Sequence, residues 1–403
     1  MYNQYTQNFL LIFCTKIYPL SVFVNFARSL IKLSLKKRAK EVKNKMRVYN
    51  FSAGPAMMFE EVLNRVQSKF LNYDGVGMSV MEMSHRGPHY GEINLETERL
   101  LRELMNVPQN YAILFVQGGA STQFDAIPLN LNKNKKADYI VTGLWSGNAY
   151  AEAPRYTDAK CIASSEDKGF SYIPKITKDM IRPDADYLHY CQNNTIYGTS
   201  FKFVPDAGSV PLVNDLSSCI LSEELDVSKF GVLYACAQKN IGPSGVTVVI
   251  VRKDLLDNYS QHCPHMLRWK LAADNVSMYN TPPGFSTYVS MEVFKYLKEI
   301  GGVKVVQKMN QDKAKVLYDH IDNSKMFKNN VVKEDRSIMN VPFFALSKDL
   351  DEKFIVEAEK NGLSTLRGHK AAGGMRASIY NAMPAKGVQA LVDFMKKFEM
   401  DNR

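Results

Sequence analysis

The sequence predicts an α/β fold, in which a large domain with a mostly parallel, seven-stranded sheet covered by helices is followed by a smaller C-terminal α+β domain. Apolar runs of strand length alternate with helical stretches between about residues 111 and 253. Most of these runs are apolar throughout, which is typical of strands buried on both faces of a parallel sheet. From about residue 290 the alternation stops, and a long helical pattern leads into separate elements. A composition of 45% hydrophobic and 23% charged residues is that of a globular protein.

The first elements after Met46 are an extended piece with a turn, "RVYNFSAGPAMM", and a helix predicted from about Glu60 to Tyr73. The stretch "GVGMSVMEMSHRG" is predicted to be a loop with a short strand-like centre. Apolar residues at helical spacing in "YGEINLETERLLRELMNV" predict the next helix. The predicted strands follow in this order: "YAILFVQGG", "ADYIVTG", "AKCIASS", "ADYLHYCQN", "VPLVNDLSS", "GVLYACAQ" and "GVTVVIVRK".

The C-terminal part begins with one long predicted helix over residues 289–324. It continues with "SIMNVPFFAL", a helix near 351–361, "GGMRASIYN" and a last helix, "AKGVQALVDFMKKFEM". The elements divide the chain into a segment 46–59 that packs with the small domain, a large domain 60–300 and a small domain 301–403. Residues 1–45 are expected to be an extension that is disordered or not native.

The net charge of +10 belongs mainly to this extension. Residues 1–45 carry nine lysines and arginines and one acid, Glu41, so they account for eight of the ten net charges. Their apolar runs precede the basic end, the reverse of a signal peptide, and Lys16 and Pro19 interrupt them too early for a bilayer span. A transit peptide or a membrane-surface helix is the alternative to a non-native extension. The nearly neutral remainder indicates neither a nucleic-acid nor a membrane partner, and we expect a cytoplasmic protein.

Six cysteines show no CxxC or His-paired spacing, and several lie in apolar runs. The pattern indicates a reducing compartment, with neither a disulfide framework nor a metal site.

Lys239 raises the functional question, because it emerges directly from the apolar run of "FGVLYACAQKNIGPSG". A lysine in a turn is ordinarily solvent-exposed. However, ligands of open α/β sheets bind at the carboxyl ends of the strands, where functional residues therefore collect.

Two other predicted strands also end in candidate residues. "LFVQGGASTQF" runs from a strand through Gly118 and Gly119 into a helix, and such a helix N-terminus can hold a phosphate. In "VPLVNDLSS", Asp215 ends an apolar strand, and a buried carboxylate needs a cationic partner. Alone, the glycine turn is common, and a strand-end aspartate often caps its own turn.

Together, an amine, a carboxylate and an anion cradle suit pyridoxal 5'-phosphate. This cofactor needs a lysine for its aldehyde, an acid for its pyridinium nitrogen and donors for its phosphate. Desolvation against the apolar strand would lower the pKa of the amine and make it nucleophilic.

Seven motifs in sequence order make the match specific: "FSAGPA", "MEMSHRG", "QGGASTQF", "VNDLSS", "AQKNIGPSG", "YNTPP" and "GHKAAGGMRASIYNAMP". With them, residues 47–400 resemble the phosphoserine aminotransferase family, in the class V branch of the fold-type I pyridoxal-phosphate enzymes. The resemblance implies a homodimer whose active sites are shared across the subunit interface. It makes residues 60–300 the cofactor-binding domain.

The resemblance also implies the role of each site residue. Lys239 would bind the cofactor as a Schiff base and transfer the proton, Asp215 would pair with the ring nitrogen, and Trp145 would stack on the ring. Thr195 would bond the ring hydroxyl. The phosphate would be held by Ala120, Ser121 and Gln238, and by Asn280 and Thr281 of the neighbouring subunit. Arg376 would bind the substrate α-carboxylate, since its planar fork matches a carboxylate. A second anion pocket, for the substrate's phosphate or the side-chain carboxylate of glutamate, would contain His85, Arg86, His369 and Lys370.

The implied reaction converts 3-phosphohydroxypyruvate and L-glutamate into O-phospho-L-serine and 2-oxoglutarate in serine biosynthesis, with ping-pong kinetics. Many bacterial relatives also accept the 4-phosphohydroxythreonine pair of vitamin B6 synthesis. Some relatives have arginine in place of Ser121 or Lys370, which leaves the phosphate affinity open. The alternatives are another class V enzyme, either of the alanine–glyoxylate type or a cysteine desulfurase, and, from a different class, a basic peripheral protein that binds nucleic acid or membranes.

Overall fold

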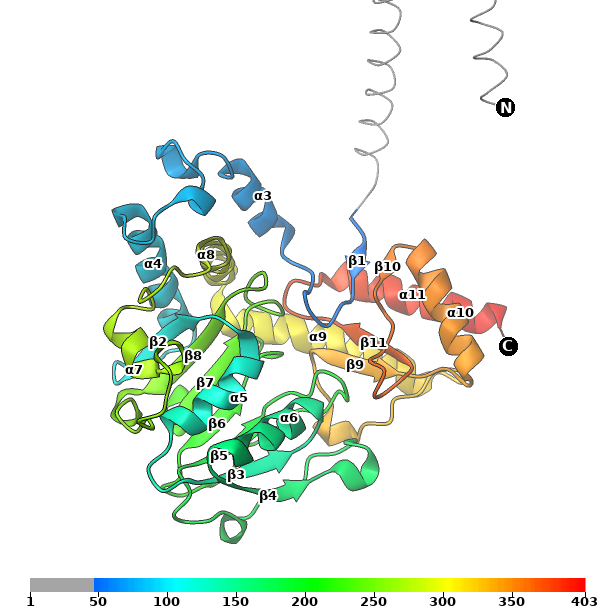
Figure 1. Cartoon of the computed structure of the whole chain (residues 1–403). Helices are drawn as coiled ribbons and strands as arrows, with labels where there is room; N and C mark the ends of the chain where they lie inside the picture. Colours follow the sequence, from blue (N-terminus) through cyan, green and yellow to red (C-terminus); the bar gives the residue numbers. More distant parts are fainter. Residues whose placement is uncertain (1–46, 403) are drawn as a thin grey trace, which may run out of the picture. The chain divides into compact units, whose positions relative to one another are not determined.

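The computed structural model describes residues 47–402, and from Tyr49 onward the chain forms one compact unit (Figure 1). The predicted extension, residues 1–45, lies outside the described residues. Within residues 47–402, no helix combines the length and the apolar character that a bilayer crossing requires.

A single seven-stranded sheet organises the large domain, as predicted. Its strands are β2 (Tyr111–Val116), β3 (Lys136–Val141), β4 (Asp158–Ser164), β5 (Tyr187–Cys191), β6 (Leu212–Asp215), β7 (Val232–Cys236) and β8 (Thr247–Arg252). They are ordered β2-β8-β7-β6-β5-β3-β4. All neighbours are parallel except β8, which is antiparallel to both β2 and β7. The connection from β7 to β8, residues 237–246, is too short for a crossover helix, so β8 must return beside β7.

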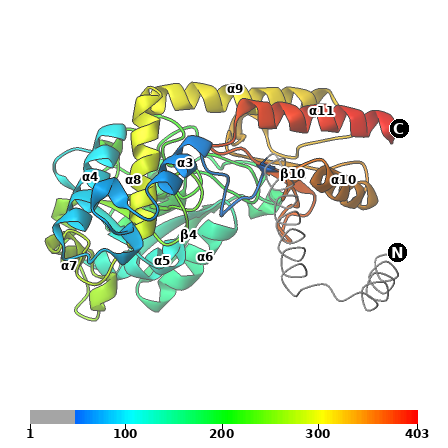
Figure 2. The ribbon, with the colours of Figure 1, turned by 90° about the horizontal axis from the view of Figure 1, so that it is seen from above.

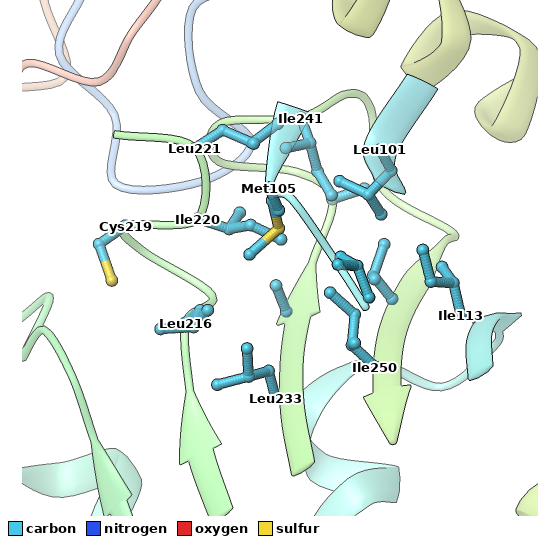
Figure 3. Packing of buried hydrophobic residues seen from close by; sticks show 14 of the residues in the cluster. Leu101, Met105, Ile113, Leu216, Cys219, Ile220, Leu221, Leu233, Ile241 and Ile250 are labelled. Carbon is cyan, nitrogen blue, oxygen red and sulfur yellow. The ribbon is translucent and has the colours of Figure 1, made fainter. Parts of the chain in front are cut away.

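Helices cover both faces of this sheet (Figure 1). One face packs against α4 (Pro88–Leu104) and α8 (Gly284–Glu299), and α3 (Glu60–Ser68) contacts α8. The other face packs against α5 (Gly119–Asn130), α6 (Leu144–Glu152) and α7 (Trp269–Asp274). On the first face, Leu101 and Met105 meet strand residues such as Leu233 and Ile250 (Figure 3). Fully burying one such side chain contributes about 1.5–3 kcal/mol.

The smaller domain has its own core. It comprises α9 (Gly302–Asn323), β9 (Asn340–Phe343), α10 (Lys348–Lys360), β10 (Leu363–Ser364), β11 (Met375–Ser378) and α11 (Ala385–Asp401). The helices α9 and α11 lie side by side (Figure 2). The segment after Met46 joins this domain, since β1 (Tyr49–Asn50) pairs in parallel with β10 and Phe51 is buried in the same core.

Three local predictions were wrong. The long helix over 289–324 is two helices, α8 and α9, because Gly301 and Gly302 have φ angles of 108° and 77°, which end one helix and begin the next. The first helix stops at Ser68 and is followed by a 3₁₀ turn at Tyr73–Gly75. The expected strand-like centre of the next loop is a 3₁₀ turn, Val80–Glu82, which the Ser79–Glu82 capping box stabilises.

Candidate active site

Lys239 is half-buried rather than an exposed turn lysine. It lies in the turn after β7, where the N–H groups of Ile241 and Gly242 both donate to Ala237 O (3.2 and 2.9 Å). Its Nζ donates to Thr195 Oγ1 over 2.9 Å and lies 6.0 Å from the centroid of the Trp145 ring. Desolvation lowers the pKa of Lys239, although the charge of nearby Asp215 opposes this effect. A larger neutral fraction makes this amine a better nucleophile.

The segment after β1 packs closely over Lys239. A Cβ atom on Gly54 would lie 3.3 Å from Lys239 Cγ, and Gly54 has a φ angle of 140°. The segment is held by two hydrogen bonds, from Ala56 N–H to Gln238 O and from the Tyr380 hydroxyl to Ala53 O, each 2.9 Å long. Glycine at position 54 therefore lets the backbone approach the lysine.

Asp215 ends β6, and its side chain is buried. It accepts a hydrogen bond from Ser217 N–H (2.8 Å), and Cys191 Sγ lies 3.9 Å away. Burial raises the pKa of Asp215, and Ser217 and Lys239 oppose this rise. Among the described residues, no cation lies within ion-pair distance of this carboxylate, so a positive charge beside it would be stabilising.

The glycine turn before α5 has the geometry of an anion cradle. Gly118 and Gly119 have φ angles of 93° and 71°, and a Cβ on Gly118 would lie 1.9 Å from Thr122 Oγ1. Ser121 is exposed at the helix N-terminus. The N–H of Ala120, expected to meet a phosphate, donates to Cys236 Sγ over 3.0 Å. Because a thiol is a weak acceptor, a phosphate oxygen could replace it.

Arg376 lies in β11 and faces the lysine across Thr195. Its Nη1 donates to Thr195 O (3.3 Å), and its buried Nε has no hydrogen-bond partner. No carboxylate within the described part of the chain pairs with it. Burial lowers the pKa of Arg376, so this guanidinium is a desolvated cation without an anion.

His369 and Lys370 lie in a loop from Gly368 to Gly374. Burial lowers the pKa of His369, and the nearby charges of Arg376 and Lys370 lower it further. The N–H of Gly368 donates to Gly374 O (2.9 Å), which closes the loop at its base. The basic side chains of His369, Lys370 and Arg376 therefore lie near one another.

Other predicted residues lie apart from this group. His85 lines a cavity of about 270 Å³ together with Thr281, and Asn280 lines a neighbouring cavity of about 290 Å³. Arg86 is exposed. Gln117 Nε2 donates to Thr281 O (2.9 Å), so the 280–281 segment lies beside the glycine turn of its own chain. Within the described range, no hydrogen bond or ion pair joins His85 or Arg86 to Lys239 or Arg376.

What these residues need matches what pyridoxal 5'-phosphate carries. Asp215 needs a cation, which a protonated ring nitrogen provides, and the turn at Gly118 suits a phosphate. Trp145 Nε1 is buried without a partner, and its ring lies near the lysine. The residues present therefore fit the cofactor.

Comparison with known proteins decides the family. The sequence profile described as Aminotransferase class-V matches residues 48–391. The chain belongs to the class V aminotransferases. A relative from Bacillus thuringiensis subsp. konkukian, named phosphoserine aminotransferase, is 51% identical over 358 residues, 89% of this chain and 99% of the relative. One of the same name from Listeria monocytogenes serotype 4b is 52% identical over 354 residues, 87% of this chain and 96% of the relative.

Solved structures agree with this assignment. Phosphoserine aminotransferase from Bacillus circulans subsp. alkalophilus superposes with a TM-score of 0.86 at 45% identity, covering 89% of this chain and 99% of that one. PLP-bound phosphoserine aminotransferase from Trichomonas vaginalis gives 0.83 at 41% identity, covering 87% and 100%. An alanine–glyoxylate aminotransferase from Nostoc, at 16% identity over 88% and 96% of the two chains and a TM-score of 0.69, shares the fold alone. The predicted family, fold-type I architecture and pyridoxal-phosphate dependence of this class V aminotransferase are confirmed.

Sequence reasoning missed three contributors to the site. Gly54 was seen only as part of a motif, although it borders Lys239. Cys236 was treated as a small core hydrophobe, but its thiol accepts the Ala120 N–H. Ser217 was not singled out, although its N–H bonds Asp215. The only available signal was position, because Cys236 and Ser217 both lie within three residues of a predicted site residue.

Proposed function

We propose that this class V aminotransferase is a phosphoserine aminotransferase. It transfers the amino group of L-glutamate to 3-phosphohydroxypyruvate, which gives O-phospho-L-serine and 2-oxoglutarate. Relatives that match nearly their whole length to this chain carry that name. The observation that carries the proposal is that Arg376, bonded to Thr195 O, has His369 and Lys370 near it, since a substrate with two anionic groups needs more than one cation.

Each site residue has a distinct task. Bound pyridoxal 5'-phosphate supplies an electron sink for the substrate Cα and carries the amino group between the two substrates. Arg376 binds the α-carboxylate with its planar fork and so orients the Cα–H bond. Lys239 accepts the Cα proton as a base and returns it, and its lowered pKa favours this role.

The surrounding residues hold and shield the reacting groups. Asp215 holds a positive ring nitrogen in place by charge, and the Thr195 hydroxyl, already bonded to Lys239 Nζ, orients the amine. Trp145 covers one side of the lysine and excludes water. Ala120, Ser121 and Gln238 would hold the cofactor phosphate around the glycine turn.

The substrate phosphate is assigned to His369 and Lys370, with His85 and Arg86 completing the pocket. His85 shares a cavity wall with Thr281. We propose a homodimer in which the loop of His85 and Arg86, together with Asn280 and Thr281, contributes to the active site of the neighbouring subunit. The protein is also proposed to act in the cytoplasm and to accept the 4-phosphohydroxy-L-threonine pair of pyridoxine biosynthesis.

The test is amino transfer to 2-oxoglutarate from O-phospho-L-serine, compared with L-serine and L-alanine. A kcat/KM at least 100-fold higher for phosphoserine is expected, because the two unphosphorylated donors leave the second group of cations unpaired. Lys370→Gln should raise KM for phosphoserine, because it removes one of the cations assigned to the phosphate. Equal use of L-alanine and phosphoserine would refute the phosphate assignment and favour an aminotransferase of another specificity.

A further inference from the structure

The loop that follows Asp215 is held by an unusual set of buried amides. Three successive backbone carbonyls, those of Ile220, Leu221 and Ser222, each accept a hydrogen bond from an asparagine side chain. Their donors are Asn240 Nδ2 (3.0 Å), Asn381 Nδ2 (2.9 Å) and Asn310 Nδ2 (3.0 Å), respectively. The three asparagines come from three different parts of the fold and are all buried.

These asparagines are also bonded to one another. The backbone N–H of Asn381 donates to Asn240 Oδ1 (3.0 Å), and Asn310 Nδ2 donates to Asn381 Oδ1 (2.8 Å). The amide of Asn240 is therefore bonded on both sides, through Nδ2 to Ile220 O and through Oδ1 to the Asn381 N–H. An asparagine is required there, because an aspartate lacks the donor for Ile220 O and an alanine leaves both buried partners unpaired.

Each bonded segment leads directly to a residue of the active site. Asn240 follows Lys239 in the chain. The loop 216–222 follows Asp215, and the side chains of Leu216, Ile220 and Leu221 anchor it in the core (Figure 3). Asn381 lies in the segment that leaves β11, the strand of Arg376.

We propose that Asn240 is a positioning residue for amino transfer. Together with Asn381 and Asn310, it fixes three segments relative to one another: the turn of Lys239, the loop after Asp215 and the strand of Arg376. It touches neither substrate nor cofactor. Its amide joins the turn of Lys239 to the segment that follows Arg376, so the distance between the amine and the carboxylate-binding guanidinium depends on this bond. The proposal rests on the proposed function only for the choice of phosphoserine as substrate.

The additional residues Lys313 and Met339 strengthen the same junction. Lys313 Nζ donates to the carbonyls of Ile379 (3.1 Å), Tyr380 (2.8 Å) and Met383 (3.0 Å), and so holds the chain on both sides of Asn381. Asn240 Nδ2 also lies 3.7 Å from Met339 Sδ. Lys313 of α9 already holds the carbonyls of this segment by hydrogen bonds. If the bonds of Asn240 are lost, we therefore expect the turn of Lys239 to move rather than the strand of Arg376.

The test compares Asn240→Ala, Asn240→Asp and Asn310→Ala with the wild-type holoenzyme. For Asn240→Ala we expect kcat to fall at least about 10-fold, and the pH at which the absorption of the Lys239-bound cofactor changes should move by at least about 0.5. Asn240→Asp keeps the acceptor for the Asn381 N–H but turns a carboxylate oxygen toward Ile220 O, so it should show both effects as well. Asn310→Ala should raise KM for glutamate about 5-fold with a smaller change in kcat.

Asn94→Ala is the matched control. Like Asn310, Asn94 is a buried helix residue, and in both residues Oδ1 has no hydrogen-bond partner. Asn94 Nδ2 donates to a backbone carbonyl, that of Val276 (2.9 Å). It should lose a similar amount of thermal stability without the spectral change. If Asn240→Ala loses stability but keeps the wild-type kcat and the wild-type spectral titration, the residue is merely structural and the proposal is overturned.

The spectral titration needs no substrate. The comparison for glutamate can be made in its half-reaction, from the glutamate concentration that gives half of the maximal rate of the absorbance change. A wild-type enzyme that uses glutamate but not phosphoserine would refute the proposed substrate and leave the positioning proposal to be decided by the variants.

Discussion

Replacing the buried lysine of α9 should change how the stability of the protein depends on pH. Lys313 is 3% exposed, and burial lowers its pKa from 10.5 to about 7. Between these two values the unfolded chain binds the proton and the folded protein does not, so the free energy of unfolding rises with pH. Because a tenfold change in proton affinity corresponds to about 1.4 kcal/mol, the full span between the two pKa values is about 5 kcal/mol.

The accessible part of that span can be measured by urea denaturation. From about pH 6.5 to about pH 8.5, Lys313 should add about 2 kcal/mol to the free energy of unfolding. Lys313→Met lacks this contribution. The free energy of unfolding of the wild type should therefore rise by about 2 kcal/mol relative to that of the variant over this pH range. The bonds that Lys313 makes to three carbonyls also depend on its proton, because a neutral amine has only two N–H donors, whereas a methionine has no proton to lose.

Lys315→Met is the control for this experiment. Lys315 lies on the same helix, its side chain is 70% exposed, and it pairs with Asp319 at 2.5 Å. Its removal should leave the pH dependence unchanged. If the difference between wild type and Lys313→Met stayed constant across this pH range, the three carbonyls would be holding the ammonium charged, and the desolvation argument would be wrong.

The remaining predictions concern the active site and the sheet beneath it. Lys239→Ala should bind the cofactor without a covalent bond, so that borohydride treatment followed by denaturation leaves no added mass on the protein, whereas the wild type keeps it. Gly118→Ala should weaken cofactor binding at least about 10-fold in equilibrium dialysis, because its Cβ would collide with Thr122 Oγ1, while Gly75→Ala, at a φ angle of 84° with open space around it, should bind normally. Burial lowers the pKa of His189 from 6.5 to about 3, so the unfolded chain binds the extra proton and stability should fall by about 3 kcal/mol between about pH 8 and pH 4.5. A His189→Gln variant that lost stability in parallel with wild type in urea titrations would contradict this assignment.

The sheet was predictable because its strands are marked by composition alone. Runs such as Thr247–Arg252 contain consecutive β-branched residues and are buried almost throughout. The antiparallel direction of β8 was not foreseen, although the short connection after β7 already implied it. Loop length therefore carried information that the apolar pattern did not.

The break between α8 and α9 was missed for a physical reason. The apolar pattern continues on both sides of Gly301 and Gly302, and glycine within a helix costs only about 1 kcal/mol. Only the positive φ angles show that the chain turns there. A glycine pair inside a helical pattern is thus compatible with either outcome until tertiary packing selects one.

Parts of the candidate site could be predicted because they lie at strand ends. Lys239, Asp215 and Thr195 follow three strands of one sheet, so the topology brings them together. The asparagine triad could not be predicted in this way. Its members are 70 or more positions apart in sequence, and an asparagine beside a turn or in a helix looks the same whether or not its amide is bonded.

The loop from Gly368 to Gly374 has a consequence for protein engineering. Its base is fixed by the bond between these two glycines and by a second bond, from Arg376 N–H to Leu366 O (2.7 Å). A Cβ on Gly368 would lie 2.0 Å from Gly373 O, so the base of the loop admits no larger residue there. Between them, residues such as Lys370 are exposed to solvent. Libraries can therefore vary the length and charge of this tip while the strand of Arg376 keeps its register.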